Sequence, residues 1–173
     1  MDVHGPEEED RIERSDRDGS SGVRGAVRKI VKRGQVEIPE SNDPDRVLWQ
    51  LEQFTGRVVQ KHGATSVEAA RAHMELSLQL GRMQRWEEVR SLREGSLASL
   101  RELRGEHDPE TLQTEVSLAI ALAHTGRSRE TEVHLQHAAS TSLEALGPDH
   151  EVTRLAQAKL DEFRRGQPNE WTV

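Results

Sequence analysis

The sequence contains no cysteine and no tyrosine, and its aromatic residues are three tryptophans and two phenylalanines. The absence of cysteine excludes disulfides, thiolate metal ligands and a cysteine nucleophile. So few aromatics argue against a large aromatic-lined ligand pocket. No apolar run approaches the roughly 18 residues that a membrane-spanning helix needs, and the opening MDVHGPEEED lacks the basic region and apolar core of a secretory signal. We therefore expect a cytoplasmic protein with no membrane span.

Charged residues are abundant, with 24 Lys and Arg against 31 Asp and Glu and a formal net charge of −7. A chain with a pI near 5.6 is a poor general nucleic-acid coat, because phosphate binding relies on an excess of basic side chains. At 173 residues, the chain has the length of one domain with at most a tail. Arginine outnumbers lysine by 20 to 4, a usage typical of GC-rich bacterial genomes, so we expect a bacterial protein.

The composition changes near residue 44. Residues 1–45 carry 12 acidic and 8 basic side chains but only nine of the larger apolar ones. Such a segment cannot bury enough apolar surface to offset a backbone ordering cost of roughly 1–2 kcal/mol per residue. We therefore predict a charged, flexible and largely disordered N-terminal arm over residues 1–43.

Part of this arm has the spacing of a short basic helix. Val23, Val27, Ile30 and Val31 recur at helical spacing within residues 23–33. Five basic residues lie between them: Arg24, Arg28, Lys29, Lys32 and Arg33.

Four interpretations of this basic stretch stay open. It is an arm that contacts nucleic acid or an anionic lipid surface, a helix that docks on another protein, a segment that covers the first helix of the following domain near Trp49, or a solvated tail. The acidic run Glu7–Asp10 lies nearby and would oppose binding to a polyanion.

An internal repeat organises the remainder of the chain. Gly63, Gly105 and Gly147 are spaced 42 and 42 residues apart. The same shift aligns a set of leucines, namely Leu76, Leu118 and Leu160. One shift serves the whole stretch without a gap, so we interpret it as a true repeat of about 42 residues.

Each unit has the pattern of two helices. Asp108 is a good N-cap with Pro109 at the first helical position, an apolar stripe follows, and Gly126 ends the helix. By the same reasoning Thr65 is expected to open a capping box, and Ser128 and Asp149 to start the later helices. The resulting division is a half-unit at 44–62, repeats at 63–104 and 105–146, a closing helix at 147–166 and a tail at 167–173.

A short helix pair cannot bury its own apolar face, so successive pairs must stack into a shared core. Trp86 is expected in that core and Trp49 to be partly exposed.

These residues resemble a tetratricopeptide repeat (TPR) of the kinesin-light-chain type, over about residues 44–165. The motifs that carry the resemblance are LGPDH at 146–150, DPET at 108–111, LA at 118–119, GR at 126–127 and RWEEV at 85–89. Three positions depart from the pattern: Gln84 replaces a turn glycine, and Ser77 and Thr131 replace packing alanines. Met74-Glu75 and Val116-Ser117 stand where the family often has peptide-binding asparagines.

The resemblance implies an all-α fold, a short right-handed α-α superhelix whose first helices line a concave face. That face would bind a charged or polar peptide or protein through Arg71, Glu75, Arg82, Gln113, Ser117, His124, Lys159 and Glu162. The alternative is that these are ordinary solvated residues.

Signals for chemistry are weak. His134 and His137 lie three residues apart and can share a helix face, a spacing that suits two metal ligands or simply a polar surface. The pairs His107-Asp108 and Asp149-His150 lie at helix starts, where aspartate caps. No phosphate-binding loop or nucleophile motif is present, so we expect no enzyme, no cofactor and no metal.

Two functions are therefore expected. The first is a non-enzymatic protein–protein interaction module, an adaptor or a subunit of a larger assembly, which binds through the concave face and the arm. The alternative is a regulatory protein whose repeats sense a peptide or protein while the arm contacts nucleic acid. Self-association through an exposed end helix is a further option.

Overall fold

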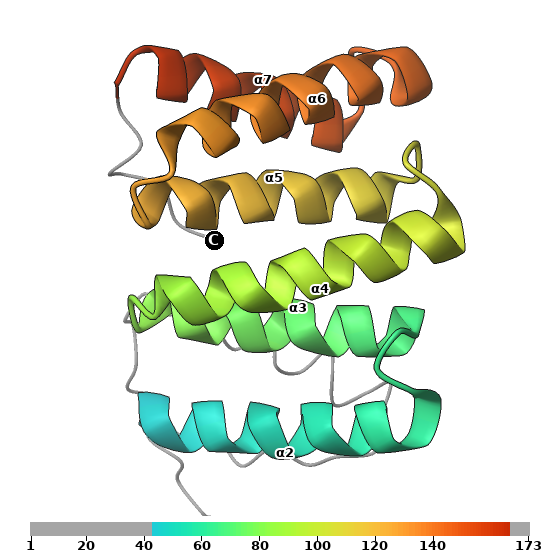
Figure 1. Cartoon of the computed structure of the whole chain (residues 1–173), viewed down its shortest axis with the longest axis vertical. Helices are drawn as coiled ribbons and strands as arrows, with labels where there is room; N and C mark the ends of the chain where they lie inside the picture. The colour runs from blue at the N-terminus through green and yellow to red at the C-terminus, as the bar shows by residue number, and fades with distance from the viewer. Residues whose placement is uncertain (1–42, 167–173) are drawn as a thin grey trace, which may run out of the picture. The chain divides into compact units, whose positions relative to one another are not determined.

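The computed structural model describes residues 43–166, and this part of the chain is all-α, as predicted, with no β-strand. Six helices follow one another in sequence (Figure 1). They are α2 (Pro44–His62), α3 (Val67–Arg82), α4 (Trp86–Arg104), α5 (Pro109–His124), α6 (Ser128–Leu146) and α7 (Glu151–Arg164). The basic stretch 23–33, the other residues of 1–42 and the tail 167–173 lie outside the described residues.

The helix bounds repeat with the period found in the sequence. The first helix of each unit begins at residue 67, 109 or 151, and the second at residue 86 or 128, a step of 42 in each series. Helix α2 begins at 44, one step before α4, so it corresponds to the second helix of an incomplete unit. Within residues 43–166, no helix has both the length and the hydropathy needed to span a bilayer.

The three glycines that mark the period end the second helices. Gly63, Gly105 and Gly147 have φ angles of 87°, 86° and 83° with ψ between 153° and 171°. This region is essentially restricted to glycine. Each glycine N–H donates to the carbonyl four residues earlier, at 2.9–3.2 Å. A Cβ would meet nothing within 4 Å at these positions, so backbone conformation rather than packing requires the glycines.

The first helices are capped at equivalent positions. Asp108 Oδ1 accepts from the Glu110 backbone N–H at 2.9 Å, which confirms the predicted cap. The predictions for Thr65 and Asp149 were wrong by one residue, because Ser66 Oγ and His150 Nδ1 accept the corresponding bonds. Ser66 and His150 lie 42 residues on either side of Asp108, so the repeat register locates the caps better than the local capping-box pattern does.

The second helices begin differently. Arg127 occupies the N-cap position of α6 and makes no side-chain capping bond, so Ser128 is the first residue of the helix and not its cap. Arg85 occupies the same position before α4. Each of these arginines instead pairs with a glutamate three residues later, Glu88 or Glu130. This pairing replaces a cap in both units.

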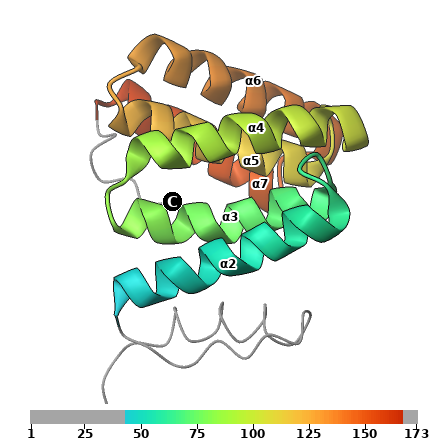
Figure 2. The ribbon, with the colours of Figure 1, turned by 60° about the horizontal axis from the view of Figure 1, so that its bottom comes forward.

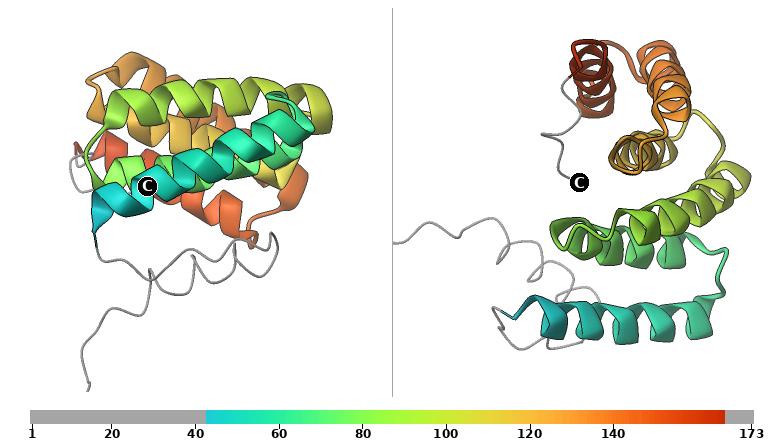
Figure 3. Two further views of the ribbon diagram at one scale, coloured as in Figure 1. Left: turned by 90° about the horizontal axis from the view of Figure 1, so that it is seen from below. Right: turned by 60° about the vertical axis from the view of Figure 1, so that its left-hand side comes forward.

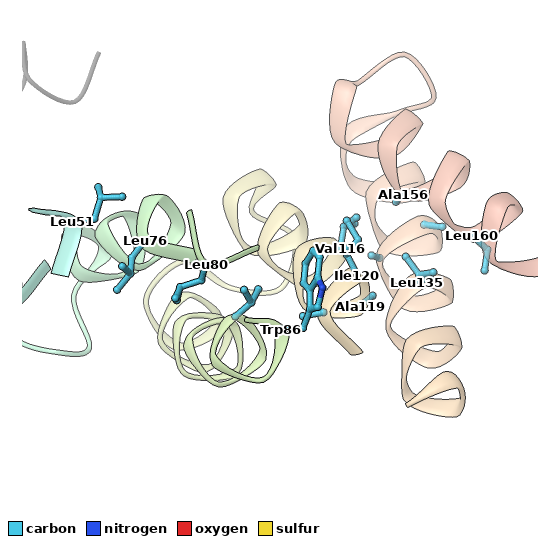
Figure 4. Close-up of a cluster of buried hydrophobic side chains, with 14 of the residues drawn as sticks. Leu51, Leu76, Leu80, Trp86, Val116, Ala119, Ile120, Leu135, Ala156 and Leu160 are labelled. Carbon is cyan, nitrogen blue, oxygen red and sulfur yellow. The ribbon is translucent and has the colours of Figure 1, made fainter. Parts of the chain in front are cut away.

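Successive helices pack against each other along the array, and α5 also contacts α7 (Figures 2 and 3). A single apolar core runs through the array from Leu51 of α2 to Leu160 of α7 (Figure 4). Trp86 belongs to it, as predicted, with 9% of its surface exposed, whereas Trp49 is 60% exposed. The core therefore joins all six helices into one packed body.

Three departures from the repeat pattern are accommodated locally. Gln84 has φ 61° at the position where the next unit has Gly126 with φ 76°. That backbone region costs a non-glycine residue about 1 kcal/mol, and the Gln84 side chain offsets it by accepting a bond from Trp86 Nε1 at 3.0 Å. Buried Ser77 and Thr131 donate their hydroxyls to carbonyls of the preceding turn, at 2.8 and 3.0 Å.

Candidate functional site

The predicted binding residues lie on α3, α5 and α7, on a surface that we call the first-helix face. It consists of Arg71, Glu75, Arg82, Gln113, Ser117, His124, Lys159 and Glu162. Helices α3 and α5 are joined across this surface by an ion pair, and α5 packs against α7. The structure therefore places these residues on three neighbouring helices.

One member of this face is held in an ion pair that the sequence did not reveal. Arg71 Nε lies 2.6 Å from Glu110 Oε1, and Arg71 Nη2 lies 3.1 Å from Glu110 Oε2, a bidentate arrangement. The hydrogen bond to Glu110 raises the pKa of Arg71. Arg104 of α4 approaches the same carboxylate at 3.4 Å. Arg71 therefore joins two repeat units.

Other members also have internal contacts. His124 stacks on Trp86 with ring centroids 3.7 Å apart and an interplanar angle of 4°. Lys159 Nζ lies 2.9 Å from Glu162 Oε2 within α7. Ser117 donates to a carbonyl of its own helix at 3.0 Å. The remaining members are Glu75, Arg82 and exposed Gln113, of which the first two are close to a buried arginine.

That arginine is Arg93 of α4, which the sequence analysis did not single out. It is 1% exposed, and within residues 43–166 neither its Nε nor its Nη1 has a hydrogen-bond partner. Burial lowers the pKa of Arg93 to about 10, and the charge of Glu75 opposes this shift. Arg93 is thus a positive charge in the interior with unused donors, which is a costly state.

The position of Arg93 on α4 indicates where its side chain lies. Ser96, about 60° away around the helix, contacts His73 of α3 with Oγ and Nδ1 3.5 Å apart. Arg101, about 80° away on the other side, donates to Glu115 of α5 at 2.9 Å. Arg93 therefore faces the junction of α3 and α5, the two helices that α4 packs against.

Two titratable neighbours on α3 respond to Arg93. Burial raises the pKa of Glu75, and the charges of Arg93 and Arg82 oppose that rise. Burial, and then the charge of Arg93, lower the pKa of His73. The site therefore combines the first-helix face residues Glu75 and Arg82 with a buried cation and a neutral imidazole.

A sequence signal for this site existed. Val89, Arg93 and Leu97 are spaced four residues apart, so they share one helix face, and both neighbours are buried. A shift of 42 residues places Leu135, which is fully buried, at the position of Arg93. A charged residue at a core position of a repeat was therefore visible in the alignment of the two units.

Acidification is expected to reduce the free energy of unfolding through His73. Because its folded pKa lies below the ordinary 6.5, the unfolded chain binds a proton that the folded chain does not, and stability is lost as the pH falls below about 6.5. Urea unfolding of wild type, His73→Gln and the exposed control His107→Gln at about pH 7.5 and pH 5.5 measures this effect. His73→Gln should show the weaker pH dependence. An unchanged pH dependence in His73→Gln would exclude the effect.

A second polar cluster connects three helices away from the first-helix face. The buried carboxylate of Glu115 on α5 lies 2.9 Å from each of Arg101 Nη2 on α4 and His134 Nδ1 and His137 Nδ1 on α6. Burial alone would raise the pKa of Glu115. The hydrogen bonds from the two histidines and the charges of His137 and Arg101 outweigh burial, so the pKa lies below its ordinary value of 4.5.

This arrangement gives the two histidines, considered above as metal ligands, a different role. Both use Nδ1 to hydrogen-bond Glu115. In the part of the chain that the structure describes, no group of three or more His, Asp or Glu side chains is placed to hold a metal ion. The cluster therefore acts as an internal connection between repeat units.

The chain matches no protein-family model, and no curated protein resembles it significantly. The functional interpretation therefore rests on the geometry described above.

Proposed function

We propose that this chain is a non-enzymatic interaction module of the TPR type, which binds a protein or peptide through the first-helix face. The observation that carries the proposal is a polar surface contributed by three successive first helices and held by one continuous apolar core. The 42-residue step of the helix bounds supports the assignment to this type of repeat. A preorganised surface loses little conformational entropy when a partner binds.

The mixed charge of the face sets the type of partner. Arg71 is already paired with Glu110, and Lys159 with Glu162. Exposed Arg82 and Gln113, together with half-buried Glu75, are the residues best placed to contact a ligand. We infer that the partner is a polar or charged segment and that the module serves as an adaptor or assembly subunit.

The test is a matched pair of double variants in the full chain. Partners are captured with the wild-type protein, identified by mass spectrometry and purified for titration calorimetry. Arg82→Glu with Gln113→Arg changes the first-helix face, whereas Arg129→Glu with Gln136→Arg makes the same changes at exposed positions of α6. The first variant should weaken binding by roughly tenfold or more, and the second should not, at unchanged melting temperatures. Equal effects of the two variants would refute the proposal.

A further inference from the structure

The state of Arg93 has no explanation in the fold itself. A guanidinium carries five N–H donors and no acceptor, and here Nε and Nη1 are buried without a partner in the described part of the chain. Buried polar groups in folded proteins are normally hydrogen-bonded. An unused pair of donors on a buried cation therefore indicates a missing acceptor.

The repeat offers an internal comparison. In the next unit the equivalent of Arg93 is Leu135, which is fully buried and packs in the apolar core. The helix pair thus folds with leucine at this place and does not need the arginine. The position of Glu75 corresponds to Ser117 in the same comparison, so the acidic neighbour is also particular to the first unit.

The junction that Arg93 faces borders the proposed binding surface. Arg93 faces the junction of α3 and α5, and Glu75 and Arg82 of α3 belong to the first-helix face. Both Arg93 and Arg82 act electrostatically on Glu75, so the three groups lie near one another. A ligand on the first-helix face therefore approaches Arg93 past Glu75.

We propose that Arg93 receives a carboxylate of the partner, which enters between α3 and α5 and accepts hydrogen bonds from its unused donors. A carboxylate has acceptors only and forms strong charge-assisted bonds with guanidinium groups. The partner segment is thus acidic, through side chains or through its C-terminal carboxylate. This inference rests on the proposed function and specifies the chemistry of the partner.

Glu75 makes the proposal more specific. Its carboxylate is half-buried and lies in the field of Arg93, so it competes with an incoming carboxylate. Replacing Glu75 by glutamine removes that competition and should tighten the binding of an acidic ligand severalfold. Glu144→Gln, at an exposed position of α6, makes the same change in net charge and serves as the control.

The experiment uses the full chain and two defined peptides at roughly 50 mM salt. Hexaglutamate with acetylated and amidated ends presents side-chain carboxylates only, and hexaserine with a free C-terminus presents one terminal carboxylate. Calorimetric titration of wild type, Arg93→Leu and Arg129→Leu compares two variants with the same loss of charge. We expect Arg93→Leu to weaken one peptide by roughly tenfold or more, with Arg129→Leu close to wild type and Glu75→Gln tighter.

The outcomes separate the sources and the hypotheses. Loss of hexaglutamate alone identifies side-chain carboxylates, and loss of hexaserine alone identifies a terminal carboxylate. Failure of wild type to bind either peptide, or equal losses in Arg93→Leu and Arg129→Leu, overturns the inference. If captured partners still depend on Arg82 and Gln113 but not on Arg93, the proposed function stands and the carboxylate site does not. Melting curves confirm that each variant is folded.

Discussion

Replacing Glu115 by alanine is expected to lower the free energy of unfolding by about 3 kcal/mol, since removing one member of a buried ion pair strands the others. Three donors from two neighbouring helices, Arg101 on α4 and His134 and His137 on α6, then lose their common acceptor. These donors are partly exposed and can be hydrated, which keeps the loss below the upper end of the range. The measurement is urea unfolding followed by circular dichroism at neutral pH.

A matched control and the pH dependence make this prediction specific. Glu144→Ala removes an exposed carboxylate from α6 and should change stability by less than about 0.5 kcal/mol. Because the folded pKa of Glu115 lies below 4.5, its contribution is complete above pH 4.5 and is lost as the pH falls through the folded value. The difference between wild type and Glu115→Ala should therefore shrink in acid. A variant as stable as the control would show that the cluster contributes nothing.

The second large effect is expected from exchanging the equivalent residues of the two repeats. Leu135→Arg places an unpaired charge in a fully buried apolar position and should cost more than about 4 kcal/mol. Arg93→Leu removes an unpaired buried charge and should stabilise the protein by about 1–3 kcal/mol. Opposite signs at equivalent positions would show that the arginine is kept at a cost to stability.

Thermal and urea unfolding of both single variants and of the double variant measure this exchange. The two sites lie in different repeat units, so their effects should add within about 0.5 kcal/mol. A destabilising Arg93→Leu would mean that the donors of Arg93 are satisfied in solution. In that case the argument for a missing acceptor would lose its basis.

Much of the fold was predictable because its signals are local. Gly63, Gly105 and Gly147 end helices by a backbone conformation that depends on no tertiary partner. Asp108 and Pro109 likewise start a helix on their own. The two misplaced caps arose from judging single helices, whereas the repeat register places Ser66 and His150 correctly.

The candidate site was less predictable. His124 was expected to face a ligand, and the structure places its ring on Trp86 of the preceding helix. Glu115 lies between apolar Leu112 and Ala119 on the helix, so its burial agrees with its spacing, but its three donors come from other helices. No pattern within one helix specifies which side chains of its neighbours will reach it.

The sequence by itself determined where the helices begin and end, that they repeat every 42 residues and that they stack through an apolar core. These properties follow from backbone conformation, capping and helical spacing, all of which act over a few residues. Only the tertiary structure decided which charged residues are buried and with what partners. Burial of Arg93 and Glu115 depends on how α4, α5 and α6 pack together, and helical spacing alone does not contain that information.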